Sequence, residues 1–449
     1  MSEPMDPIRS AALRRQRLAE RIGEDAALVV PAAREQPRNR DVEHPFRQDS
    51  DFSYLTGFPE PDAVAVLTPG REEGTFTLFV RDRAPSAEQW SGRRVGPQGA
   101  REVYGADEAW PIEALDEQLP QLLVNRDRLI APLGRDERWD HRLLTWLQAA
   151  RRAARGRERA PQRIDLLDDN LHEQRLIKQP DELEAMHRAA GISVAAHRRA
   201  MQAVQPGMRE YTLAAELIGI FHRHGAEPAY PSIVAGGANA CVLHYVTNRD
   251  ELQDGDLVLI DAGAEAEGYA ADITRTFPVN GTFTGEQRAV YDIALAAQKA
   301  AIDEVRAGRD FDSFHQAATR ILTEGMIELG WLEGERDSLI EQGAHRRFFP
   351  HRTGHWLGAD VHDVGRYAVG GQWRTLEPGM VVTVEPGLYC PPQSEGVDSR
   401  WHGIGVRIED DVVVEQEGPR VLTDAVPKEA DEIEAMIAAV HSAYYEDSD

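Results

Sequence analysis

The sequence predicts two domains of mixed helix and strand, an α/β domain followed by an α+β domain. Its 449 residues are about three times the usual length of one domain, which favours two. Short apolar runs alternate with helix-like segments in the first part, whereas longer amphipathic helices and acid-containing strands dominate after residue 176. We therefore expect an N-terminal domain over 1–174 and a second domain over 175–449.

The first domain shows the alternation that is typical of an α/β fold. Residues 6–23 carry apolar side chains at helical spacing and end in a glycine, which predicts a helix. Apolar runs bounded by proline and glycine predict strands at 27–30, 63–67, 75–80 and 129–131, with a further helix near 142–152. The basic stretch 151–163 ends near a proline and predicts a solvated connector.

The second domain opens with a long amphipathic helix that has Pro180 in its first turn, followed by acidic residues. A second helix is expected over 211–224. Further predicted elements are strands at 257–264, 273–279, 381–384 and 406–414, and a helical block from 286 to about 329.

Composition excludes several classes of protein. Hydrophobic residues make up 42% and charged residues 28%, as in ordinary globular proteins. The net charge of -26 repels phosphate, so we expect neither a nucleic-acid nor an anionic-membrane partner. Two cysteines cannot make a disulfide scaffold and favour a reducing cytoplasm. The N-terminal residues lack the apolar core of a signal peptide, and no apolar run is long enough to span a bilayer.

Two aspartates lie eleven positions apart in apolar surroundings. Asp261 ends the run LVLID, and Asp272 begins DITRTFPV. If the intervening turn is centred between Ala266 and Glu267, the two carboxylates face each other, with Cβ atoms about 4.5–5.5 Å apart. Carboxylates that close repel each other unless a proton or cations separate them. The alternative is two solvated residues beside a hairpin turn.

Two glutamates and a histidine cluster follow. Glu385 ends VVTVE and Glu409 lies within GVRIEDDVVV, where a buried acid requires a cation or strong hydrogen bonds. An edge-strand acid that faces water is the alternative for each. The segment HRTGHWLGADVHDVG holds His351, His355 and His362, and three histidines within twelve residues favour a site over a structural role.

Four carboxylates and an imidazole form an oxygen-rich ligand set. Such a set suits two divalent ions, with Mn²⁺ the expected metal and Co²⁺ or Zn²⁺ as alternatives. A bridged pair about 3.5–4 Å apart would neutralise the acids and acidify a shared water, which is hydrolase chemistry. His244, in ACVLHYVTN, is a further candidate for this site.

The order Asp, Asp, His, Glu, Glu resembles that of the pita-bread metallopeptidases. The strings LVLIDAGAEAEGYAADITRTFPV, HRTGHWLGADVHDVG, VVTVEPGLY and GIGVRIEDDV are similar to its proline-peptidase branch, and most of all to the aminopeptidase P (Xaa-Pro aminopeptidase) family. The N-terminal RQDSDFSYLTGFPEPDAV and WSGRR extend the likeness over almost the whole chain. The resemblance implies a creatinase-like N-terminal α/β domain and a pita-bread catalytic domain.

The resemblance also implies the metal ligands. Asp261 and Asp272 would hold one ion, with Asp272 bridging to the second. His355 and Glu385 would complete the shell of the second ion, and Glu409 would bridge both. Arg352 departs from the family pattern and could alter the charge of the pocket.

Substrate-handling residues follow from the same resemblance. His244, His351 and His362 would line the substrate site, where His362 would stabilise the oxyanion. Glu385 would also relay the proton to the leaving nitrogen. Arg407 and Tyr389 match positions close to the metals. Trp90 resembles an aromatic residue presented by a neighbouring subunit, which implies a homodimer or homotetramer; packing inside its own domain is the alternative.

The implied reaction is hydrolysis of the peptide bond between an N-terminal residue and a following proline, by attack of a metal-bridging hydroxide. The bond before proline needs a dedicated enzyme, because the proline ring fixes φ and removes the backbone N–H, so ordinary aminopeptidases cleave this bond poorly. One alternative is a prolidase, which cuts only Xaa-Pro dipeptides on the same fold. The other is a metal-free creatinase-type relative, which the complete ligand set disfavours.

Overall fold

The computed structural model describes residues 6–446. The chain forms two compact units, with the boundary between Gln174 and Arg175. Among the described residues, no helix is both long enough and apolar enough to cross a membrane.

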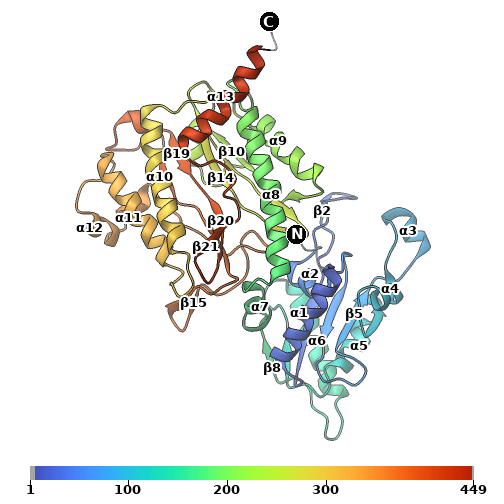
Figure 1. The fold of residues 1–449 in the computed structure, drawn as a ribbon. Helices are drawn as coiled ribbons and strands as arrows, with labels where there is room; N and C mark the ends of the chain where they lie inside the picture. Colours follow the sequence, from blue (N-terminus) through green and yellow to red (C-terminus); the bar gives the residue numbers. More distant parts are fainter. Residues whose placement is uncertain (1–5, 447–449) are drawn as a thin grey trace. The chain divides into compact units, whose positions relative to one another are not determined.

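The N-terminal unit is built on a six-stranded mixed sheet of order β6-β5-β4-β1-β7-β8 (Figure 1). β1 runs antiparallel to β4 and parallel to β7. The strands are β1 (Ala26–Pro31), β4 (Val64–Leu67), β5 (Phe76–Val80), β6 (Glu108–Pro111), β7 (Arg128–Ile130) and β8 (Arg163–Asp165), with a separate hairpin of β2 (Pro37–Asn39) and β3 (Val42–Glu43). The helices are α1 (Pro7–Ile22), α2 (Ser50–Thr56), α3 (Pro85–Ser91), α4 (Gly96–Glu102), α5 (Leu115–Leu122) and α6 (Glu137–Ala153).

Both faces of this sheet are covered, which explains why β1 is a continuous apolar run. Leu28 and Val30 on one face pack in a core with Leu18 of α1. Val29 on the other face packs in a core with Trp146 of α6. The predicted helix 6–23 and the four predicted strands of this domain are confirmed, and the predicted helix near 142–152 begins earlier, at Glu137.

The C-terminal unit consists of several small sheets flanked by helices. Figure 1 shows its central strands between the packed pair α8 and α9 and the packed pair α10 and α11. The unit boundary falls within the short helix α7 (Glu173–Leu176). The helices that follow are α8 (Pro180–Ala203), α9 (Glu210–Arg223), α10 (Gly285–Glu304), α11 (Ser313–Glu328), α12 (Arg336–Glu341) and α13 (Ala430–Glu446). The strands are β9 (Glu227–Pro228), β10 (Ile233–Gly236), β11 (Leu257–Asp261), β12 (Ala264–Ala266), β13 (Tyr269–Ala270), β14 (Thr274–Pro278), β15 (Ala368–Val369), β16 (Gln372–Trp373), β17 (Val381–Val384), β18 (Gly387–Cys390), β19 (Ile404–Arg407), β20 (Asp410–Val414) and β21 (Pro419–Val421).

The predicted register across the Asp261–Asp272 hairpin is wrong by two residues. Asp261 pairs with Thr274, because the turn is centred between Glu267 and Gly268, which have φ of 53° and 77°. Positive φ at both central residues is the type I′ geometry that suits a tight hairpin. The predicted single strand 257–264 is also broken, since β11 and β12 belong to different sheets. Gly263 lies at this break, where an added Cβ would lie 1.7 Å from the carbonyl oxygen of Ala271.

The predicted strand 406–414 is likewise two strands. β19 pairs with β18, whereas β20 pairs with β17 and β21, so the chain changes sheets at Glu409. The predicted helical block 286–329 is the pair α10 and α11, separated by the segment 305–312, in which Gly308 has a φ of 88°. The first break follows from the different pairing partners of β19 and β20, and the second lies in the segment 305–312 between the two helices.

Candidate metal and substrate site

The ends of strands from different sheets deliver the acidic residues to one place. Asp261 ends β11, Asp272 lies two residues before β14, Glu385 follows β17, and Glu409 lies between β19 and β20. His355 comes from the loop that precedes β15. Each acid lies at the end of a buried strand or within two residues of one, so the strand's packing holds it in position.

These residues surround a cavity of about 510 Å³ in the C-terminal unit. The cavity brings together all five predicted ligands and four of the predicted substrate-handling residues. Its lining is formed by Leu243, His244, Asp261, Asp272, Phe311, His351, Arg352, Gly354, His355, His362, Tyr367, Trp373, Glu385, Arg407 and Glu409.

Tyr230 joins the two aspartates despite the changed register. Its hydroxyl lies 2.7 Å from Oδ1 of Asp261 and also contacts Oδ1 of Asp272. Sequence reasoning missed Tyr230, because it is 31 positions from Asp261 and lies in a loop without a motif. On the other side, the guanidinium of Arg407 pairs with Asp261. The two carboxylates are therefore close enough to share a cation.

His355 presents one ring nitrogen to the acids. Its Nδ1 donates to the carbonyl of Trp356 at 2.9 Å, since a carbonyl can only accept. Nε2 then faces Oδ2 of Asp272 at 3.5 Å and Oε1 of Glu385 at 3.7 Å. A backbone bond that fixes one nitrogen and leaves the other toward a cluster of acids is the usual arrangement of a metal-binding histidine.

Glu409 completes the cluster. It is 2% exposed, and its Oε2 accepts a hydrogen bond of 2.6 Å from the hydroxyl of Thr274. Arg407 in turn donates from Nε to Thr274 at 3.2 Å. Ligand atoms of Asp272, His355 and Glu409 all lie within 4.8 Å of one another. Such spacing fits three donors around one ion.

The electrostatics of the cluster favour a cation. Burial, followed by the charge of Asp272, raises the pKa of Glu409 well above its usual value. Burial raises the pKa of Glu385 to about 7, although His355 and Arg407 oppose this shift. Burial lowers the pKa of His355, but the hydrogen bond to Asp272 and the charge of Glu385 outweigh it and raise this pKa to about 9. The buried acids are costly to ionise side by side, and the imidazole of His355 attracts a proton that partly balances them. A divalent cation bound among these groups would remove the repulsion between the carboxylates.

The remaining histidines lie around this cluster. His351 donates from Nδ1 to the carbonyl of Arg352 at 2.7 Å, and its Nε2 lies 2.9 Å from the hydroxyl of Tyr389. The ring of His362 lies edge-on to that of His355, with centroids 4.4 Å apart. His244 lines the cavity from an exposed loop.

Tyr389 is buried beside the residues that line the cavity. It does not line the cavity, and it is 2% exposed. Its hydroxyl accepts from Nη1 of Arg407 at 3.1 Å, so it contacts the site through Arg407 and His351. Both of these partners line the cavity, so Tyr389 lies directly behind its wall.

Two further predicted residues are informative. Trp90, in α3 of the N-terminal unit, is 90% exposed, so packing inside its own domain is excluded as its role. Arg352 lines the cavity, but it pairs with Asp312 and stacks 4.6 Å over the ring of Trp373. The extra positive charge of the HRTGH segment is thus compensated locally.

A two-unit chain whose second unit gathers buried carboxylates and an imidazole beside a substrate-sized cavity defines a metal-dependent hydrolase. Residues 184–416 match the model of metallopeptidase family M24, and residues 11–131 match the aminopeptidase P N-terminal domain. The chain belongs to metallopeptidase family M24, with the aminopeptidase P arrangement of an N-terminal domain before a pita-bread catalytic domain.

Known proteins similar to the chain agree with this assignment. The Xaa-Pro aminopeptidase of Escherichia coli strain K12 is 45% identical over 428 residues, which cover 95% of this chain and 97% of that protein. The structure of Pseudomonas aeruginosa aminopeptidase PepP is 51% identical with a TM-score of 0.95, and covers 98% of this chain and 100% of that one. Aminopeptidase P from E. coli with the inhibitor Pro-Leu has a TM-score of 0.92 at 44% identity, covering 97% and 99%.

Proposed function

We propose that the chain is an Xaa-Pro aminopeptidase, a metallo-exopeptidase that releases the N-terminal residue from peptides with proline in the second position. The observation that carries the proposal is the cavity that gathers Asp261, Asp272, His355, Glu385 and Glu409 within a chain similar to Xaa-Pro aminopeptidases over nearly its whole length. The two free thiols, Cys241 and Cys390, accord with a cytoplasmic enzyme.

We assign two divalent ions to the cluster, with Mn²⁺ as the expected metal. Asp261 and Asp272 would hold one ion, His355 and Glu385 would hold the other, and Asp272 and Glu409 would bridge. When bound, the ions supply Lewis-acid activation of a water and of the scissile carbonyl. The hydroxyl of Thr274 orients Oε2 of Glu409, and Tyr230 keeps Asp261 and Asp272 together.

The remaining side chains handle charge and protons. Glu385 has a carboxyl group in the cavity that can take a proton from water and return it to the leaving proline nitrogen. His362 donates a ring N–H toward the oxygen on which negative charge develops. The guanidinium of Arg407 forms an ion pair with Asp261 and also donates a hydrogen bond to the hydroxyl of Tyr389. The same hydroxyl contacts His351.

A comparison of two substrates tests the function. We expect an Xaa-Pro-Yaa tripeptide to be cleaved at the bond before proline at least as well as the matching Xaa-Pro dipeptide. The rates are measured by quantifying the released N-terminal residue. Cleavage of the dipeptide alone would identify a prolidase instead, and no cleavage of either peptide by Mn²⁺-loaded protein would refute the proposal.

Replacing His362 by alanine tests the oxyanion role. We expect turnover to fall roughly 10²- to 10³-fold, because loss of one oxyanion donor typically costs about 3–4 kcal/mol. Metal content, measured by elemental analysis, should stay normal, since His362 is assigned to substrate. The exposed His187 provides the control, and His187→Ala should leave turnover unchanged. Loss of metal from His362→Ala would make His362 a ligand and put the assignment of His355 in doubt.

The exposed Trp90 leads to a prediction about assembly. We propose that Trp90 forms part of a partner subunit's substrate site, so the enzyme should sediment as a dimer or tetramer. Trp90→Ala should raise KM or lower turnover with a normal metal content. The adjacent surface change Gln89→Ala serves as the control. A monomer at assay concentration would contradict this proposal.

Mixing two defective chains gives a sharper test of a shared site. Trp90→Ala chains retain a metal site, and Asp272→Ala chains retain Trp90. After subunit exchange, a hybrid pairs one intact metal site with one intact Trp90, so activity should exceed that of either parent. Mixtures no better than their parents would count against a shared site.

A further inference from the structure

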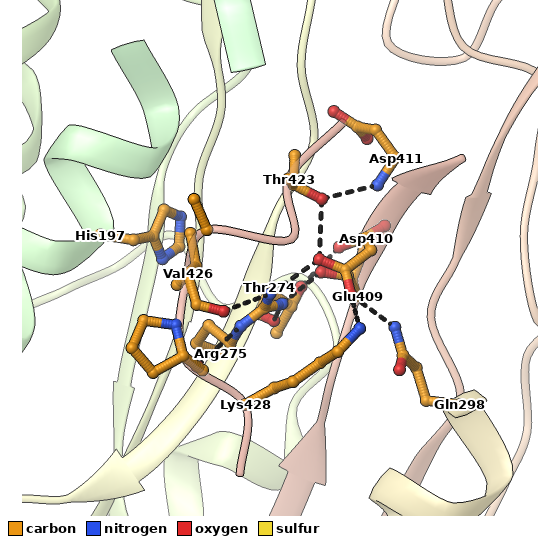
Figure 2. Close-up of polar contacts among 12 residues, drawn as sticks. His197, Thr274, Arg275, Gln298, Glu409, Asp410, Asp411, Thr423, Val426 and Lys428 are labelled. Carbon is orange, nitrogen blue, oxygen red and sulfur yellow. Dashed lines mark hydrogen bonds and ion pairs between the residues drawn. The ribbon is translucent and has the colours of Figure 1, made fainter. Parts of the chain in front are cut away.

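A buried arginine lies directly behind the proposed metal site. Arg275, in β14, is fully buried, and Figure 2 shows its guanidinium amid groups from three separate segments. A guanidinium has five N–H donors, and each has an acceptor here. Nη1 donates to the carbonyls of Thr274 (3.0 Å) and Glu409, Nη2 to Oδ1 of Asp410 (2.7 Å) and the carbonyl of Val426 (3.1 Å), and Nε to the carbonyl of Pro427 (3.2 Å).

Asp410 balances this charge. Its carboxylate is fully buried and accepts hydrogen bonds from Thr423, Gln298 and Lys428, each at 2.7 Å, in addition to the one from Arg275. Burial opposes ionisation of Asp410, but the charges of Arg275 and Lys428 outweigh it and hold its pKa below the usual range. Arg275 and Asp410 therefore form a buried ion pair whose hydrogen-bonding groups all have partners. Removing either member would destabilise the fold, because the other charge would be left buried and unpaired.

Arg275 differs from the arginine of an ordinary buried ion pair because it lies between two sheets. β14 is the edge strand of the sheet β10-β11-β14, whereas β20 belongs to the sheet β17-β20-β21. Within residues 6–446, no strand pairing therefore joins β14 to the segment that carries Glu409. Hydrogen bonds make the link instead. The N–H of Glu409 donates to the carbonyl of Thr274 at 3.0 Å, and the hydroxyl of Thr276 donates to the carbonyl of Arg407 at 3.0 Å. Arg275 adds to this link by binding the carbonyls of both Thr274 and Glu409 from one side.

This link lies between the two acids that are assigned as bridging ligands. Asp272 is three positions before Arg275, and its backbone N–H donates to the carboxylate of Asp411, at 3.1 Å and 3.2 Å. The hydroxyl of Thr274 holds the carboxylate of Glu409. Asp272 and Glu409 therefore lie on the two segments that Arg275 links, and Thr274, next to Arg275, contacts both the backbone and the carboxylate of Glu409.

We propose that Arg275 is a positioning residue for the metal site: by clamping the carbonyls of Thr274 and Glu409, it fixes the spacing of the two bridging carboxylates and thereby the affinity for divalent ions. This proposal rests on the metal site of the proposed function. Removal of groups that orient metal ligands typically lowers metal affinity about 10- to 100-fold.

Lys428 offers a matched control for a purely structural role. Its ammonium group binds the same carboxylate, that of Asp410, at the same 2.7 Å distance that Arg275 keeps. Its side chain is 18% exposed, and in the described part of the chain it donates no hydrogen bond to the backbone of Thr274 or Glu409. Lys428→Met should therefore lower the melting temperature without changing affinity for metal.

The experiment uses the full-length, metal-free protein and Mn²⁺ alone as the probe. Wild type, Arg275→Lys, Arg275→Met and Lys428→Met are titrated calorimetrically with Mn²⁺, and each is checked for a cooperative thermal transition. Arg275→Lys keeps the charge beside Asp410, but an ammonium on a shorter stem lacks the planar fork that reaches both carbonyls. We expect its Mn²⁺ affinity to fall about 10- to 100-fold, with turnover recovering at excess Mn²⁺.

The outcomes separate this proposal from the proposed function. Wild-type protein that binds no Mn²⁺ would overturn the metal site itself. Wild-type binding with an unchanged affinity in folded Arg275→Lys would overturn the positioning role alone, as would an equal loss of affinity in Lys428→Met. If Arg275→Met does not fold, Arg275→Lys decides; if neither folds even with saturating Mn²⁺, Arg275 serves folding and the positioning role is refuted.

Discussion

Alanine in place of Glu409 is expected to reduce turnover more than about 10³-fold, equivalent to about 4 kcal/mol of transition-state stabilisation. Glu409 is buried, and its carboxylate lies within the group of ligand atoms that includes Asp272 and His355. As a bridging ligand it would contact both ions, so its loss should both remove metal and leave the remaining acids repelling each other. Turnover on an Xaa-Pro tripeptide and metal content by elemental analysis measure the two effects.

Glu415 supplies the control for this substitution. It follows the same strand, β20, but is about half exposed and pairs with Arg420. Glu415→Ala should retain wild-type turnover and metal content. A Glu409→Ala protein that kept both ions and turned over within tenfold of wild type would exclude a bridging role for this carboxylate.

Removal of metal is expected to abolish activity, and Mn²⁺ or Co²⁺ should restore it. The carboxyl groups of Glu385 and Glu409 have pKa values raised first by burial, and neighbouring acids add to this effect. Divalent ions neutralise this charge and bind only the folded site, so they should also stabilise the protein.

The size of this stabilisation can be measured. At an Mn²⁺ concentration 100-fold above Kd, one site contributes about 2.7 kcal/mol, which corresponds to a rise in Tm of roughly 5–10 °C for a domain of this size. Calorimetry of metal-free and Mn²⁺-loaded protein measures the shift, and Mg²⁺ serves as a comparison. Activity that persists in protein shown by elemental analysis to be metal-free would refute the mechanism.

The residues that we assign to the metal site were visible in the sequence because local sequence makes them unusual. Asp261, Glu385 and Glu409 are acids at the ends of runs of Val, Leu and Ile, where an unpaired charge would be costly. Their order along the chain matches that of a metallopeptidase, and the structure gathers them around one cavity. The alternation of helix and strand predicted the class of each domain for the same reason, since periodicity is a local property.

The register and the contacts behind the site were decided by tertiary structure. The hairpin turn lies at Glu267–Gly268, which moves the partner of Asp261 from Asp272 to Thr274, and the residue that joins the two aspartates is the distant Tyr230. The chain changes sheets at Glu409, within the single strand predicted over 406–414, because β19 and β20 pair with different strands.

By itself, then, the sequence determined the two-domain class, the family resemblance and the identity of the clustered acids and histidines. Tertiary structure decided which atoms meet: Tyr230 between the aspartates, Thr274 on Glu409, and Arg275 across two sheets. The physical reason is the range of the interactions. The pattern of apolar and polar residues that indicates burial and periodicity involves only neighbouring residues. A hydrogen bond such as that between Arg275 and Glu409, which are 134 positions apart, depends on how the sheets pack.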